Sequence, residues 1–80
     1  MTVSFAQDIR PLFTDIDVAH MRNLGVLLDD FHYMRDPGHA RAVLNAVRTG
    51  TMPPSGSGEP GWTPESVQLF QDWMTGGYQA

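Results

Sequence analysis

Apolar side chains recur at helical spacing in the second half of the chain, first between Asp36 and Gly50. Asp36 is a residue type that caps helix N-termini, and Pro37 suits the first helical position. Gly50 is a typical helix stop. The apolar stripe between them consists of Ala40, Val43, Leu44 and Val47. This pattern predicts a helix that begins at Pro37 and ends at Gly50.

The last apolar stripe has the clearest helix signals in the sequence. Thr63 is the expected cap, Pro64 opens the helix, and Glu65 suits its positive N-terminal end. The stripe itself consists of Val67, Phe70, Trp73 and Met74. Because Gly76 and Gly77 follow directly, we expect the helix to stop there.

The N-terminal segment predicts a further helix with an early break. Ser4 and Gln7 form a capping-box pattern ahead of an apolar face. That face consists of Phe5, Ile9, Leu12 and Phe13. Because proline cannot donate a backbone hydrogen bond, Pro11 is expected to kink or shorten this helix.

Shorter helical segments are expected in the middle of the chain. One runs from Asp17 through Arg22 and ends near Gly25. Asp29 or Asp30 caps one more turn, formed by the residues FHYM. No stretch alternates between apolar and polar positions over a useful strand length. We therefore expect a single all-α domain over residues 1–80, with about four helices.

The absence of cysteine narrows the function classes most. It excludes disulfides, thiolate metal sites, thioether-linked cofactors and a nucleophilic cysteine.

The net charge is −4, and the five basic residues are arginines without a basic run, which argues against a nucleic-acid or anionic-membrane binder. No apolar run approaches the roughly 18 residues of a membrane span, and the N-terminus has no signal-peptide pattern. These features predict a cytoplasmic protein.

Signatures of catalysis or of a metal centre are weak. No serine has a G-x-S-x-G context, and no glycine-rich phosphate loop occurs, so we expect no enzymatic activity. Two loose groups combine carboxylates with imidazoles: Asp15, Asp17 and His20, and Asp30, His32, Asp36 and His39. Helix capping explains these aspartates better, with Asp15 or Asp17 on the second helix and Asp36 on the third. We therefore expect no metal site, and we expect His32 and His39 on exposed faces.

The order of the motifs resembles that of a class I cytochrome c domain, from about Val3 to Gly77. The likeness rests on SFAQDIRPLF at the start, and on GTMPP followed by TPESVQLFQDWMTGG at the end. The resemblance implies a cytochrome c-like fold in which the first and last helices cross.

The haem-binding motif of that family is degenerate in this chain. In the family, the first helix leads into C-x-x-C-H, whose cysteines attach the haem and whose histidine ligates the iron. Here His20 keeps the histidine position, whereas Ile16 and Ala19 stand where the cysteines would be. Met52 falls where the second axial ligand of the family usually lies. Covalent haem is therefore excluded, and the chain resembles a cysteine-free, haem-free branch.

Two functions follow from this resemblance. The first is a haem-free accessory or interaction module, which has no cofactor and contacts a protein partner or a second copy. The alternative is an electron-transfer protein that binds haem non-covalently, with His20 and Met52 as axial ligands. We favour the first function because the sulfur attachments and an export signal are both missing.

A haem-free version of the fold must fill the volume of the missing macrocycle. Phe31, Tyr33, Trp62 and the methionines are the residues large enough to do so. Trp62 and Tyr78 could instead belong to a partner-facing patch. The core is expected to consist of Phe5, Ile9, Leu12, Phe13, Leu44, Val47, Val67, Phe70 and Trp73.

Overall fold

The computed structural model describes residues 3–50 and 62–80. Over these two ranges the chain is mostly helical, and its only extended pairing is an isolated bridge between Ser4 and Gln79. The helical elements are η1 (Phe5–Ile9), η2 (Arg10–Leu12), α1 (Asp15–Arg22), α2 (Phe31–Met34), α3 (Pro37–Thr49) and α4 (Pro64–Thr75). The predicted all-α class is confirmed.

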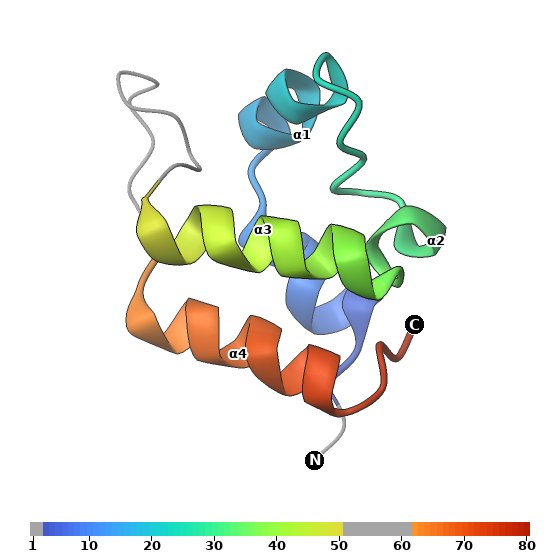
Figure 1. Ribbon diagram of the computed structural model, residues 1–80, viewed down its shortest axis with the longest axis vertical. Helices are drawn as coiled ribbons and strands as arrows, with labels where there is room; N and C mark the ends of the chain where they lie inside the picture. Colours follow the sequence, from blue (N-terminus) through green and yellow to red (C-terminus); the bar gives the residue numbers. More distant parts are fainter. Residues whose placement is uncertain (1–2, 51–61) are drawn as a thin grey trace.

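Two long helices organise the molecule (Figure 1). Helices α3 and α4 contact each other, and η1 packs against α4 behind them. Helix α2 contacts the start of α3. In Figure 1, α1 lies at the top of the view and α4 at the bottom. The first and last helical elements therefore meet, although their crossing in the manner of cytochrome c stays a prediction. None of the described helices is long and apolar enough to cross a membrane.

The N-terminal segment is wound more loosely than an α-helix. The N–H groups of Ile9 and Arg10 donate to the carbonyls of Ser4 and Phe5, five residues back, which is the π-helical pattern. The chain then tightens into the short 3₁₀ turn η2, which contains Pro11. Since Pro11 has no N–H to donate, this change of winding at the proline fits the predicted break.

The cap of this first element differs from the predicted one in one partner. The Ser4 Oγ accepts from the Gln7 N–H at 3.1 Å, as the capping-box pattern predicts. The return bond comes from Asp8, because the Ser4 N–H donates to its Oδ2 at 2.8 Å. The wider π turn brings the fourth residue, rather than the third, back over the cap.

The predicted bounds of the long helices are confirmed. Asp36 accepts from the Gly38 and His39 N–H groups at 2.9 and 3.2 Å, and Gly50 ends α3 with a left-handed φ of 83°. Thr63 caps α4 by accepting from the Ser66 N–H at 3.1 Å. Each side chain satisfies backbone donors that the first turn of a helix leaves unpaired.

The core forms where η1, α3 and α4 meet. Its buried members are Phe5, Ile9, Phe13, Val18, Leu28, Met34, Ala40, Val43, Val47, Phe70 and Trp73. Three predicted core residues, Leu12, Leu44 and Val67, are only half-buried at its edge. Conversely, Val18 and Leu28 are buried although neither was in the predicted core. Leu28 lies in a connection without helical periodicity, so the apolar pattern did not identify it.

Large side chains fill the interior of the described part of the chain. Trp62 lies between Phe13 and Phe70, at ring-centroid distances of 5.3 and 6.0 Å. Met34 is fully buried, so its flexible thioether acts as a packing residue. Tyr78 packs edge-on against Trp73 at 5.2 Å, which assigns it to the core periphery.

Candidate functional site

The outward side of α1 carries the positions that the cytochrome c resemblance singles out. His20 and Ala19 are exposed, and Ile16 is 61% exposed. Leu24, in the turn that follows α1, is 65% exposed. Met52, the second predicted axial ligand, lies outside the described residues, so a His20–Met52 pair stays a prediction.

Asp17 belongs to the local structure of α1 rather than to a metal site. The expected cap was Asp15 or Asp17, and this prediction is wrong, because the cap is Thr14. The Thr14 Oγ1 accepts from the Asp17 N–H at 3.1 Å, and the Thr14 N–H donates to the Asp17 Oδ2 at 3.3 Å. Asp17 is buried, whereas Asp15 is exposed and lies 3.6 Å from Arg10. Over the described ranges, no group of three or more potential ligands is placed to hold a metal ion.

The second acidic and imidazole group also separates into structural roles. Asp30 caps α2 by accepting from the His32 and Tyr33 N–H groups at 2.9 and 3.3 Å, and Asp36 caps α3. His32 is exposed, as expected. His39 was also expected to be exposed, but it is half-buried and its ring stacks on Tyr33 with centroids 3.9 Å apart.

The His39 imidazole has both a polar partner and a ring partner. Its Nδ1 lies 2.8 Å from the Tyr33 carbonyl oxygen. The stacked rings are nearly parallel, at 11°. The contact links the end of α2 to the first turn of α3, and sequence spacing gave no signal for it. The orientation of the His39 ring depends on the turn at Arg35 and Asp36, where α2 ends and α3 begins.

An apolar pocket of about 140 Å³ lies beside His39. The side chains around it are mainly aliphatic or aromatic and include Met21, Val26, Tyr33, Ala42 and Ala46. They come from the end of α1, the following turn, α2 and α3. The pocket therefore lies at a junction of segments that are distant in sequence.

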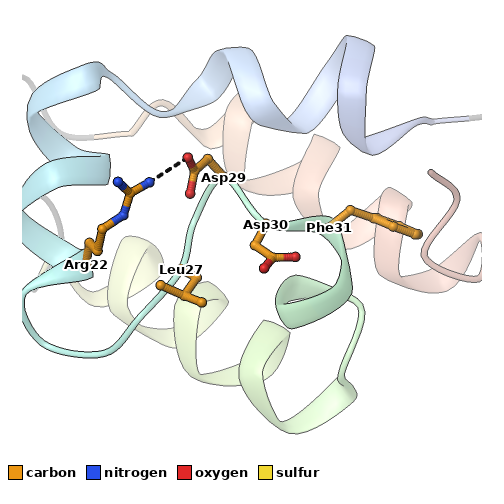
Figure 2. Close-up of a pocket in the computed structure, with 5 residues that line it drawn as sticks. All are labelled: Arg22, Leu27, Asp29, Asp30 and Phe31. Atoms are coloured by element: carbon orange, nitrogen blue, oxygen red, sulfur yellow. Dashed lines mark hydrogen bonds and ion pairs between the residues drawn. The ribbon is translucent and has the colours of Figure 1, made fainter.

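A more polar hollow lies between the end of α1 and the start of α2 (Figure 2). Arg22 reaches across it and pairs with Asp29, with 2.8 Å between Nη2 and Oδ2. Asp30 serves its own helix cap, and Phe31 points away from Arg22. The charged groups of this hollow thus already have partners within the chain, which leaves little to recruit a ligand.

Comparisons of the chain with protein families, with curated proteins and with solved structures found no match. The arguments about function therefore rest on the residues and geometry described above.

Proposed function

We propose that the chain is a haem-free, cytochrome c-like interaction module that contacts a protein partner, or a second copy, through the outward side of α1. The observation that carries this proposal is the exposure of Ile16 and Leu24, at 61% and 65%. Single exposed apolar residues are ordinary, but these two lie along one short helix and its turn, with Ala19 between them. Covering this surface with a partner removes apolar area from water, which makes the free energy of association more favourable.

The geometry around His20 favours this function over haem-mediated electron transfer. Ligating imidazoles are normally fixed through their second nitrogen, which orients the ring toward the metal. His20 is exposed on the last turn of α1, whereas the His39 Nδ1 lies 2.8 Å from the Tyr33 carbonyl oxygen. Without sulfur attachments, a haem would depend on such orientation for its affinity.

A haem titration tests the cofactor part of the proposal. Absorbance is followed for the wild type, His20→Ala and Met52→Ala in both redox states, with His32→Ala as a control for an exposed histidine elsewhere. The proposal expects no saturable one-to-one Soret band. A six-coordinate band that is lost in His20→Ala and kept in His32→Ala would contradict it and establish the alternative.

Sedimentation velocity and site-specific crosslinking test the interaction part. The wild type is compared with Ile16→Asp/Leu24→Asp and with a control of equal charge change, Ala6→Asp/Gln7→Asp, on the exposed side of η1. If the partner is a second copy, only the Ile16→Asp/Leu24→Asp variant loses concentration-dependent association. For a different partner, a photo-crosslinker at position 24 should give one discrete adduct that Ile16→Asp removes. Absence of both results would refute the interaction role.

A further inference from the structure

The pocket beside His39 has the size of a single six-membered ring. Its volume is about 140 Å³, and an engineered apolar protein cavity of roughly 150 Å³ binds benzene. Two alanines one turn apart on α3, Ala42 and Ala46, leave this space because their side chains end at Cβ.

The opposite wall of the pocket is set by the end of α1. Gly25 adopts a left-handed φ of 81°, its N–H donates to the Arg22 carbonyl at 3.0 Å, and the Val26 N–H donates to the Met21 carbonyl at 2.9 Å. This is the Schellman arrangement, in which the residue after the glycine folds back onto the last turn of the helix. Met21 and Val26 consequently face the same pocket. The wall is fixed by backbone hydrogen bonds, so the pocket exists before any ligand arrives.

His39 adds one oriented polar group to this apolar lining. The Tyr33 carbonyl oxygen can only accept, so the His39 Nδ1, at 2.8 Å from it, is the donor. In the neutral ring the lone pair is then on Nε2, which can accept a hydrogen bond. Stacking on Tyr33 holds the ring plane in place.

From this combination we propose that the pocket binds a small phenol, with its ring among Met21, Ala42 and Ala46 and its hydroxyl donating to the His39 Nε2. A charged aromatic acid fits less well, because none of the described residues that line the pocket is an arginine. An apolar ring without a hydroxyl makes no hydrogen bond to the imidazole and should therefore bind less tightly. This site is separate from the Ile16 and Leu24 positions, so the inference goes beyond the proposed interaction role and does not depend on it.

Amide chemical shifts of the full chain test the site, with phenol and benzene as the two probes. Phenol should give saturable shifts at Ala42 and Ala46, and it should bind about threefold to tenfold more tightly than benzene, as one hydrogen bond implies. His39→Phe keeps an aromatic ring but removes the acceptor, so it should abolish the preference for phenol. His32→Phe, at an exposed histidine, should leave that preference unchanged.

Filling the pocket gives a second test that does not involve the imidazole. Ala46→Leu should weaken phenol binding at least tenfold while the remaining amide spectrum keeps its dispersion. If that variant does not fold, Ala42→Leu replaces it, because Ala42 is exposed and tolerates a larger side chain. Three results would overturn the proposal: no saturable binding of phenol, equal binding of phenol and benzene by the wild type, or undiminished binding to the filled pocket.

Discussion

The Phe5 ring lies against the fully buried Trp73 indole, with 5.6 Å between the two ring centroids. One carbonyl strengthens this junction, because the Gln79 oxygen accepts from the Phe5 N–H at 2.9 Å and from the Trp73 Nε1 at 2.8 Å. The first helical turn, the last helix and the C-terminal residues are thus one packed unit.

Truncation at this junction should destabilise the domain strongly. Phe5→Ala removes the ring that is only 4% exposed and contacts both Trp73 and Phe31, so we expect the free energy of unfolding to fall by about 3–4 kcal/mol. Gln7→Ala, on the exposed side of the same turn, should change it by less than about 0.5 kcal/mol. Urea unfolding monitored by circular dichroism gives both values. A similar small effect for the two variants would show that η1 does not pack on α4.

Local signals in the sequence were sufficient for the long helices and for part of the core. Asp36 and Thr63 cap backbone groups that lie within three residues of them, and the apolar stripes that follow determine the buried helix faces. Both signals are local, so the helix bounds and buried faces can be predicted from the sequence. Burial of Leu28 was missed because it depends on where a connection without periodicity crosses the core.

The candidate sites were harder to predict, since they depend on contacts between elements. The sequence favoured a capping role for Asp17 over a ligand role, but it did not show that Thr14 is the cap and shares two hydrogen bonds with Asp17. The stacking of His39 on Tyr33 requires the turn angle between α2 and α3, which no local pattern encodes. Residue type and spacing therefore located the candidate residues without distinguishing their roles.

The reciprocal cap of α1 should show thermodynamic coupling. Thr14→Ala removes the Oγ1 that accepts from the Asp17 N–H, and Asp17→Ala removes the Oδ2 that accepts from the Thr14 N–H. Each variant should lower the free energy of unfolding by about 0.5–2 kcal/mol, because only one of the two reciprocal bonds of the cap remains. The double variant should cost less than the sum of the two single variants. Asp15→Ala, at an exposed position in the same turn, serves as the control and should have little effect. Strict additivity in the double-mutant cycle would contradict the capping box.

Gly25 should be intolerant of side chains for backbone reasons alone. A Cβ at this position would meet nothing within 4 Å, but its φ of 81° is left-handed. Gly25→Ala is therefore expected to cost about 1 kcal/mol, and Gly25→Asn should cost less, because asparagine enters the left-handed region more readily. Thermal or urea unfolding of the two variants gives the comparison. An alanine variant as stable as the wild type would show that α1 ends in a different conformation.

The two sides of α1 should respond differently to truncation, and this difference tests which side is free for a partner. Val18 is 7% exposed and packs on the core, so Val18→Ala should lower the free energy of unfolding by about 1–2 kcal/mol. Ile16 is 61% exposed, so Ile16→Ala should change it by less than about 0.5 kcal/mol although it removes a larger side chain. Both values come from urea unfolding at low protein concentration, where association does not contribute. If the order were reversed, α1 would present its other side to solvent, and the surface proposed for the partner would be buried.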